Sequence, residues 1–156
     1  MLPEMLTPVL DKHAEALATV VSIVAALIVG YFGYRANRVR HVREYTLSVL
    51  APLLTNERLF AAHSIVMDHV ISKQQLDYAA MSGKDRELVL QLLAYYEFLA
   101  AAFLRGDFDR RTVLRQRRSS IKGAWEIAQD FIDTRRRLLG RRVYNEIEDL
   151  VTNHCA

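Results

Sequence analysis

The side chains with the most chemical potential in this 156-residue chain are five histidines, one cysteine and a glutamate inside an apolar stretch. His63 and His69 are six residues apart, so they do not share one helix face as the i, i+4 pair of a zinc-binding helix does. His154 and Cys155 lie beside the chain end, which we expect to be frayed. Because there is no second cysteine and no histidine cluster, we expect no metal centre and no cofactor.

Nucleophilic and phosphate-binding motifs are also missing from the sequence. No G-x-S-x-G motif occurs, and the six glycines are scattered singly instead of forming a phosphate-binding loop. Glu97 stands in the apolar stretch Tyr95-Tyr96-Glu97-Phe98. Such a carboxylate either pairs with an arginine inside a helical bundle or performs acid–base work, and the many arginines favour pairing. We therefore expect a protein without catalytic residues that is not an enzyme.

A basic stretch is the most distinctive charged feature. Residues 105–142 carry twelve Lys or Arg against five Asp or Glu. This excess could contact the anionic inner leaflet of a membrane, bind nucleic-acid phosphates, or form a solvated helix face. The sequence leaves the three interpretations open, and we rank nucleic acid below lipid because the chain also carries a membrane-spanning signal.

That signal is an apolar run from Ala16 to Tyr34, which holds nineteen residues and no charge. As a helix it reaches about 28 Å, close to the thickness of a bilayer core. A signal peptide would have a basic start and a shorter apolar region, whereas this chain begins with three acids against Lys12. We therefore predict a single transmembrane helix over 14–35, preceded by a short extracytoplasmic segment, 1–13.

The charges flanking the run predict its orientation. Arg35, Arg38, Arg40 and Arg43 follow it directly, and basic residues stay on the cytoplasmic side. The N-terminus is thus expected outside and the rest inside, at the inner membrane of a bacterium. We expect these four arginines to contact the anionic surface of the bilayer. On the spanning helix, a ridge of small residues recurs every four positions and would let two copies approach: Ala18, Ser22, Ala26 and Gly30.

The remainder reads as all-α, with about five helices behind the membrane anchor. A juxtamembrane helix, 36–54, is expected to dock by the stripe Val39, Val42, Thr46, Val49 and Leu53 and to end near Pro52. A cytoplasmic domain, 55–156, follows, with helices expected over 56–73, 85–105, 110–139 and 141–151. Expected end signals are Asn56, Ser82, Gly106, Asp109 and Gly140, and expected interruptions of the long helix are Ser119, Ser120 and Gly123.

Several short motifs together resemble a bacterial and phage family of unknown function that pairs an N-terminal spanning helix with a helical cytoplasmic domain. They are Leu92-Leu93-Ala94-Tyr95-Tyr96-Glu97, Gly106-Asp107-Phe108-Asp109, Trp125, Arg135 to Arg137, and Tyr144-Asn145-Glu146-Ile147-Glu148. The similarity covers roughly residues 36–152. It implies that Glu97, Trp125, Arg136, Tyr144 and Glu148 form one buried or half-buried polar network.

Three hypotheses for the function follow. The first is a single-pass membrane-anchored interaction or regulatory protein that binds a protein partner at the inner leaflet. The second is a membrane-acting effector, of the phage-defence or toxin type, that oligomerises through its transmembrane helix. The third is a membrane-tethered nucleic-acid binder.

Overall fold

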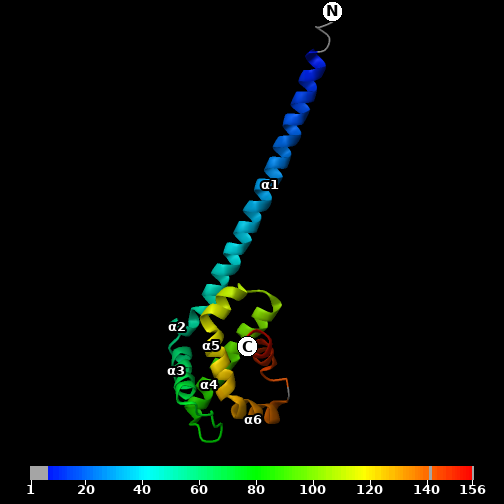
Figure 1. Ribbon diagram of the computed structural model, residues 1–156. Coiled ribbons are helices and arrows are strands. Elements are labelled where there is room, and N and C mark those ends of the chain that lie inside the picture. The colour runs from blue at the N-terminus through cyan, green and yellow to red at the C-terminus, as the bar shows by residue number, and fades with distance from the viewer. Residues whose placement is uncertain (1–6, 141, 156) are drawn as a thin grey trace, which may run out of the picture. The chain divides into compact units, whose positions relative to one another are not determined.

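The computed structural model describes residues 7–140 and 142–155, with side chains from Leu17 onward, and over these residues the fold is all-α without a strand (Figure 1). The predicted fold class is therefore confirmed. The start of the predicted segment 1–13 lies outside the described residues. The chain divides into two compact units, 1–41 and 42–156, and helix α1 (Thr7–Leu50) runs through the division.

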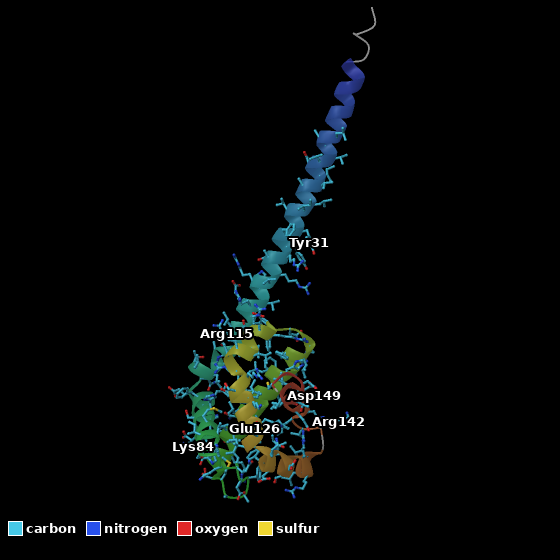
Figure 2. The ribbon with its side chains drawn as sticks, in the orientation of Figure 1. Tyr31, Lys84, Arg115, Glu126, Arg142 and Asp149 are labelled. Atoms are coloured by element: carbon cyan, nitrogen blue, oxygen red, sulfur yellow. The ribbon has the colours of Figure 1, made fainter. Side chains whose placement is uncertain are left out.

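In unit 1, the side chains of α1 have no protein neighbours to cover them. All described residues from Leu17 to His41 are exposed, including the large apolar ones, of which Leu17 is 66 % and Val29 71 % exposed. Figure 2 shows these side chains standing out around the helix, with Tyr31 labelled. A helix whose side chains are apolar on all sides, and are not covered by the rest of the protein, requires an apolar environment outside the protein. This part of α1 is a candidate membrane span.

Unit 2 begins with the last two turns of α1, which dock on the bundle as the apolar stripe predicts. Thr46, Leu50 and Leu53 are buried, whereas Val39, the first residue of the predicted stripe, lies in unit 1 and is exposed. The helix ends at Leu50, and Pro52 begins the single turn α2 (Pro52–Thr55). Proline lacks the amide hydrogen that a continuing helix would need, so its effect on the helix is confirmed.

Helix α3 (Glu57–Ser72) begins at the predicted cap. The Asn56 carboxamide accepts hydrogen bonds from the amides of Arg58 and Leu59, at 3.0 and 3.2 Å. Helix α4 (Gly83–Arg105) likewise begins at Ser82, whose hydroxyl accepts from the Asp85 amide, and ends at Gly106, whose φ of 82° is left-handed. Both ends of α4 lie where the local sequence predicts them.

Helix α4 forms the centre of unit 2, packing against α3 on one side and α7 (Asn145–His154) on the other. By length and composition α4 could also cross a membrane, but 44 % of its most apolar window is buried in protein, against 0 % for α1. Its apolar residues already have partners in the bundle, so we interpret α4 as a core helix. Its buried residues are Val89, Leu92, Leu93, Tyr96, Leu99, Ala100, Ala102 and Phe103.

The predicted long helix 110–139 is wrong in one respect, because it is two helices, α5 (Arg110–Ile127) and α6 (Gln129–Leu139). The break lies at Ala128 and not at Ser119, Ser120 or Gly123, through which α5 runs unbroken. The Ile127 carbonyl accepts its hydrogen bond from the amide of Leu76, at 2.8 Å, instead of from the next turn of its own helix. A loop distant in sequence thus ends α5.

The end of α6 agrees with the prediction, whereas the start of α7 does not. Gly140 follows α6 with a φ of 107°. The predicted last helix 141–151 begins four residues too early, and its first residue, Arg141, lies outside the described residues. Tyr144 precedes α7 with a left-handed φ of 63°. The expectation of a frayed end is also wrong, because α7 continues to His154 and Cys155 is buried.

Gly123 allows α3 and α5 to approach closely. A Cβ atom at this position would lie 2.9 Å from Cγ1 of Val70, a side chain with little rotameric freedom. We predict that Gly123→Ala lowers the free energy of unfolding by about 1 kcal/mol, because overpacking outweighs the gain in helix propensity. Urea titration of the full chain in detergent micelles measures this.

Two further variants make the prediction specific. Val70→Ala should relieve the crowding, so the double variant should be more stable than the sum of the single losses predicts. The control is Gly83→Ala, where no atom lies within 4 Å of the new methyl group. Equal losses for Gly123→Ala in both Val70 backgrounds would contradict the steric explanation.

Candidate functional site

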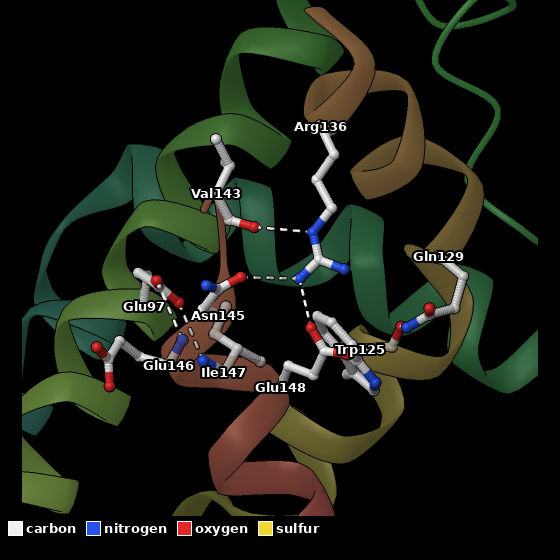
Figure 3. A network of polar contacts seen from close by, with 9 residues as sticks. All are labelled: Glu97, Trp125, Gln129, Arg136, Val143, Asn145, Glu146, Ile147 and Glu148. Carbon is white, nitrogen blue, oxygen red and sulfur yellow. Dashed lines mark hydrogen bonds and ion pairs between the residues drawn. The ribbon is translucent and has the colours of Figure 1, made fainter. Parts of the chain in front are cut away.

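A network of polar side chains joins α4, α6 and α7 in unit 2 (Figure 3). Its first member is Glu97, whose two carboxylate oxygens accept hydrogen bonds from the amides of Glu146 and Ile147, at 3.3 and 3.0 Å. These amides are among the first of α7, where backbone donors have no partner inside the helix. Glu97 therefore caps α7 from another helix, and its negative charge lies at the positive end of the helix dipole.

The second member is Arg136, which holds the connection between α6 and α7. Its guanidinium donates to the carbonyl of Val143, at 3.0 Å, and to the side-chain oxygen of Asn145, at 3.4 Å. It also forms an ion pair with Glu148 on the next turn of α7. The ring of Trp125 lies below the guanidinium carbon, 5.8 Å from it, in a cation–π arrangement. Arg136 thus binds the turn before α7 at Val143 and α7 itself at Asn145 and Glu148.

Burial shifts the pKa values of two acidic groups here. Burial raises the pKa of Glu97 above its ordinary value, although the two backbone hydrogen bonds and the charge of Arg136 oppose this shift. Burial also raises the pKa of the Tyr144 hydroxyl, against the nearby charge of Arg135. The buried Tyr144 directly precedes α7, so it lies at the same end of this helix as the amides that Glu97 caps. The partners of Glu97 and Arg136 described above are backbone groups and side chains of the same bundle, which supports a structural role for both.

Of the five residues that the resemblance implied, the structure joins Trp125, Arg136 and Glu148 by direct contacts. It places Glu97 and Tyr144 at the start of α7, without a direct side-chain contact to these three. Glu97 was expected to pair with an arginine, but its hydrogen-bond partners are backbone amides. Arg136 instead pairs with Glu148. Asn145 and the Val143 carbonyl were not foreseen. The polar sequence Asn145-Glu146 could have indicated a helix start, but backbone groups cannot be recognised from residue types.

An open groove borders this network between α6 and α7. It encloses about 660 Å³, and its lining carries both signs of charge. The lining residues are Asp130, Asp133, Thr134, Arg136, Arg137, Asn145 and Glu148. Among the described residues, no group of three histidine, cysteine or acidic side chains is placed to hold a metal ion.

A second polar cluster lies inside the bundle, on α3, α4 and α5. The His63 Nε2, the Tyr96 hydroxyl and the Arg117 Nε are each inaccessible to solvent and lack a hydrogen-bond partner among the described residues. Burial, with the charge of Arg117, lowers the pKa of His63. His69, the other histidine of α3, forms a hydrogen bond to the carbonyl of Ile65 through its Nδ1. The three atoms therefore lie inside the bundle, away from solvent.

The predicted membrane residues are divided between the units. Arg35, Arg38 and Arg40 lie exposed on α1 in unit 1. Arg43 lies in unit 2, where its Nε is 3.8 Å from the carboxylate of Asp109. The ridge of small residues, which consists of Ala18, Ser22, Ala26 and Gly30, is also exposed in unit 1. Its one hydroxyl, on Ser22, donates a hydrogen bond to the Ala18 carbonyl, at 2.8 Å.

The cap on α7 can be tested by removing its acceptors. We predict that Glu97→Ala lowers the free energy of unfolding by about 1–3 kcal/mol, because two amides at the start of α7 lose their partner. Glu97→Gln keeps one acceptor oxygen and should cost less. Urea titration of the full chain in micelles checks both variants. The control is Glu87→Ala, an exposed change on the same helix, and equal losses at 87 and 97 would contradict the capping role.

Comparison with known protein families matches most of the chain to one family. The model of the family described as Domain of unknown function (DUF4760) matches residues 20–153, which include the network and most of the apolar segment. No curated protein and no solved structure matches the chain. The predicted resemblance to a family of unknown function is confirmed, whereas a bacterial or phage origin stays a prediction. The chain belongs to the DUF4760 family of domains of unknown function.

Proposed function

We propose that this protein is a non-enzymatic, single-pass membrane protein of the bacterial inner membrane whose helical unit 2 binds a protein partner at the cytoplasmic leaflet. The N-terminus would lie outside. The role we infer is regulatory or scaffolding, exerted through binding.

One observation carries the anchoring part of the proposal: from Leu17 through Tyr34 α1 carries no charge, and all of its side chains there are exposed. Leaving so many large apolar side chains in water would oppose solubility, whereas a bilayer accepts them. The one hydroxyl on the small ridge, on Ser22, is satisfied by its own helix, as the hydrocarbon core requires of polar groups. The basic residues Arg35, Arg38 and Arg40 support the orientation.

The groove between α6 and α7 supports the binding part of the proposal. Arg136, one of its lining residues, joins α6 to the start of α7 through two hydrogen bonds and an ion pair. The lining also includes the carboxylates of Asp130 and Asp133 and the guanidinium of Arg137. A fixed surface with both signs of charge suits a polar segment of another protein, which can match each charge and each hydrogen-bonding group.

Membrane integration gives the first test. We predict that the full chain stays in the membrane fraction during alkaline carbonate extraction and leaves it only with detergent. Val24→Arg with Leu27→Arg should abolish this retention, because each arginine at the centre of a span costs about 2.5–3.5 kcal/mol. The matched control is Leu54→Arg with Phe60→Arg, which places the same charges on exposed apolar residues of unit 2. Release of the unmodified chain by carbonate would refute the anchor.

Site-specific crosslinking tests the partner. A photo-reactive amino acid replacing Asp133 at the groove should give a discrete larger product in intact cells, since a bound segment lies within reach of the probe. The same probe at the exposed Glu87 on α4, outside the groove, should give none. Immunoblotting against the chain measures both. A product of the same size at both positions, or at neither, would count against binding at the groove.

A further inference from the structure

Part of the surface of unit 2 combines exposed aromatic rings with arginines around residues 42–50 of α1. We name it the basic aromatic face and define it by Arg43, Tyr45, Phe98 and Arg115, together with Arg111, which is exposed one turn before Arg115 on α5. Tyr45 is 51 % and Phe98 46 % exposed. Both rings rest against Phe108, which is buried, with centroids 5.6 and 6.4 Å from its own. The two exposed rings are therefore fixed in place by a buried third ring.

The same α1 segment also borders a small hollow of about 360 Å³, which Arg43 and Arg115 of this face line. Arg43 and Leu47 of α1 form one wall, and Thr112, Arg115 and Gln116 of α5 form the other. Two guanidinium groups, a hydroxyl and a carboxamide thus surround a space that opens to solvent. Guanidinium groups are the side chains that bind a phosphate or carboxylate best, because several N–H donors accompany the positive charge.

The parts of this face are held together by hydrogen bonds to the loop before α5. The Thr46 hydroxyl accepts from the Asp109 amide, at 2.9 Å, and donates to the Val42 carbonyl, at 2.7 Å. Asp109 in turn accepts from the Thr112 hydroxyl and lies beside Arg43. Arg110 donates to the Phe103 and Leu104 carbonyls at the end of α4. The first turn of α5 is therefore fixed against residues 42–50.

The length of chain between the apolar run and this face limits its distance from a membrane. Seven residues, 35–41, separate Tyr34 from Val42, and as a helix they rise about 10 Å. That distance is about one Debye length at physiological salt, so lipid charges act on arginines there. Because Arg43 follows Tyr34 by only nine residues, the chain keeps this arginine within reach of a bilayer surface.

We propose that the basic aromatic face binds the anionic headgroups of the leaflet, with a headgroup phosphate or carboxylate in the hollow between Arg43 and Arg115. This proposal rests on the membrane anchoring proposed above. Arginine guanidiniums complement the negative surface of the leaflet, and half-exposed aromatic rings suit the headgroup layer, where one side is apolar and the other wet.

The second arginine cluster, on α6 and after it, does not share this role. The Arg136 guanidinium is committed to the network described above, and Arg135 has a buried Nε. Helix α6 also lies at the other end of unit 2 from residues 42–50 (Figure 1). The excess of basic residues over 105–142 therefore separates into two clusters, of which only the one on α5 faces lipid.

Fluorescence in vesicles tests this assignment on the full chain. Cys155 is changed to alanine, and a nitrobenzoxadiazole probe is attached to Phe98→Cys or, as the matched position, to the exposed Leu138→Cys on α6. Each protein is reconstituted into phosphatidylcholine vesicles with or without phosphatidylserine, and a headgroup-labelled quencher lipid is added. We expect stronger quenching at position 98 when phosphatidylserine is present, and no lipid-dependent change at position 138.

Charge variants identify the groups responsible. Arg111→Gln with Arg115→Gln should abolish the dependence on phosphatidylserine at position 98, since each arginine near the surface is worth about a fivefold change in the binding equilibrium. Arg137→Gln with Arg142→Gln removes the same charge from the other cluster and should leave it unchanged. Inorganic phosphate added to the buffer at constant ionic strength should not reduce the quenching if the bound anion belongs to lipid. Circular dichroism confirms that each variant is folded.

Each other outcome refutes a defined statement. If position 98 is quenched equally with and without phosphatidylserine, or if Arg137→Gln with Arg142→Gln has the larger effect, the face does not recognise anionic lipid. Competition by inorganic phosphate would assign the hollow to a free anion. Absence of quenching at position 98 in a chain that resists carbonate extraction overturns the face and leaves the anchor intact. Release of the chain by carbonate overturns the anchor, and the face with it.

Discussion

A carboxylate that is half-buried in a helical bundle needs donors, and Glu97 obtains them from the start of α7. Its two oxygens bind the amides of Glu146 and Ile147, which α7 itself cannot satisfy. Each side thus reduces the other's desolvation cost, because an unpartnered carboxylate and two unpartnered amides would all be unfavourable there. With α7 fixed by this cap, its next turn presents Glu148 to Arg136, and Arg136 then fixes the turn that leads from α6.

The two most apolar helices show that composition does not determine environment. Both α1 and α4 are long and apolar enough to span a bilayer. In α4 the apolar side chains pack against α3 and α7. Glu97, which stands within the apolar part of α4, accepts hydrogen bonds from backbone amides of α7. In unit 1, α1 has no such neighbours, and its apolar side chains lie on every side of the helix. The difference between them is the presence of complementary surfaces elsewhere in the chain, which a window of sequence does not contain.

The same distinction explains which structural features the sequence predicts. Asn56, Ser82, Gly106 and Gly140 could be identified because a cap acts on backbone groups within four residues of it. The break at Ala128 could not, because it depends on the amide of Leu76, about fifty residues earlier in the chain. Likewise, burial of Glu97 was predictable from its apolar neighbours, whereas its partners were not, since every residue type offers the same backbone amide.

The arginines of residues 105–142 extend this point to charge. Counted together they suggest one basic surface, yet their side chains serve different purposes. Arg110 caps the carbonyls at the end of α4, Arg136 stabilises the connection to α7, and Arg117 places its Nε where water cannot reach it. A nucleic-acid interface needs many guanidiniums along one accessible track, because its affinity grows with the number of phosphates neutralised. Arginines that are used inside the fold do not contribute to such a track, so a count of basic residues along the sequence overstates the surface that phosphates could reach.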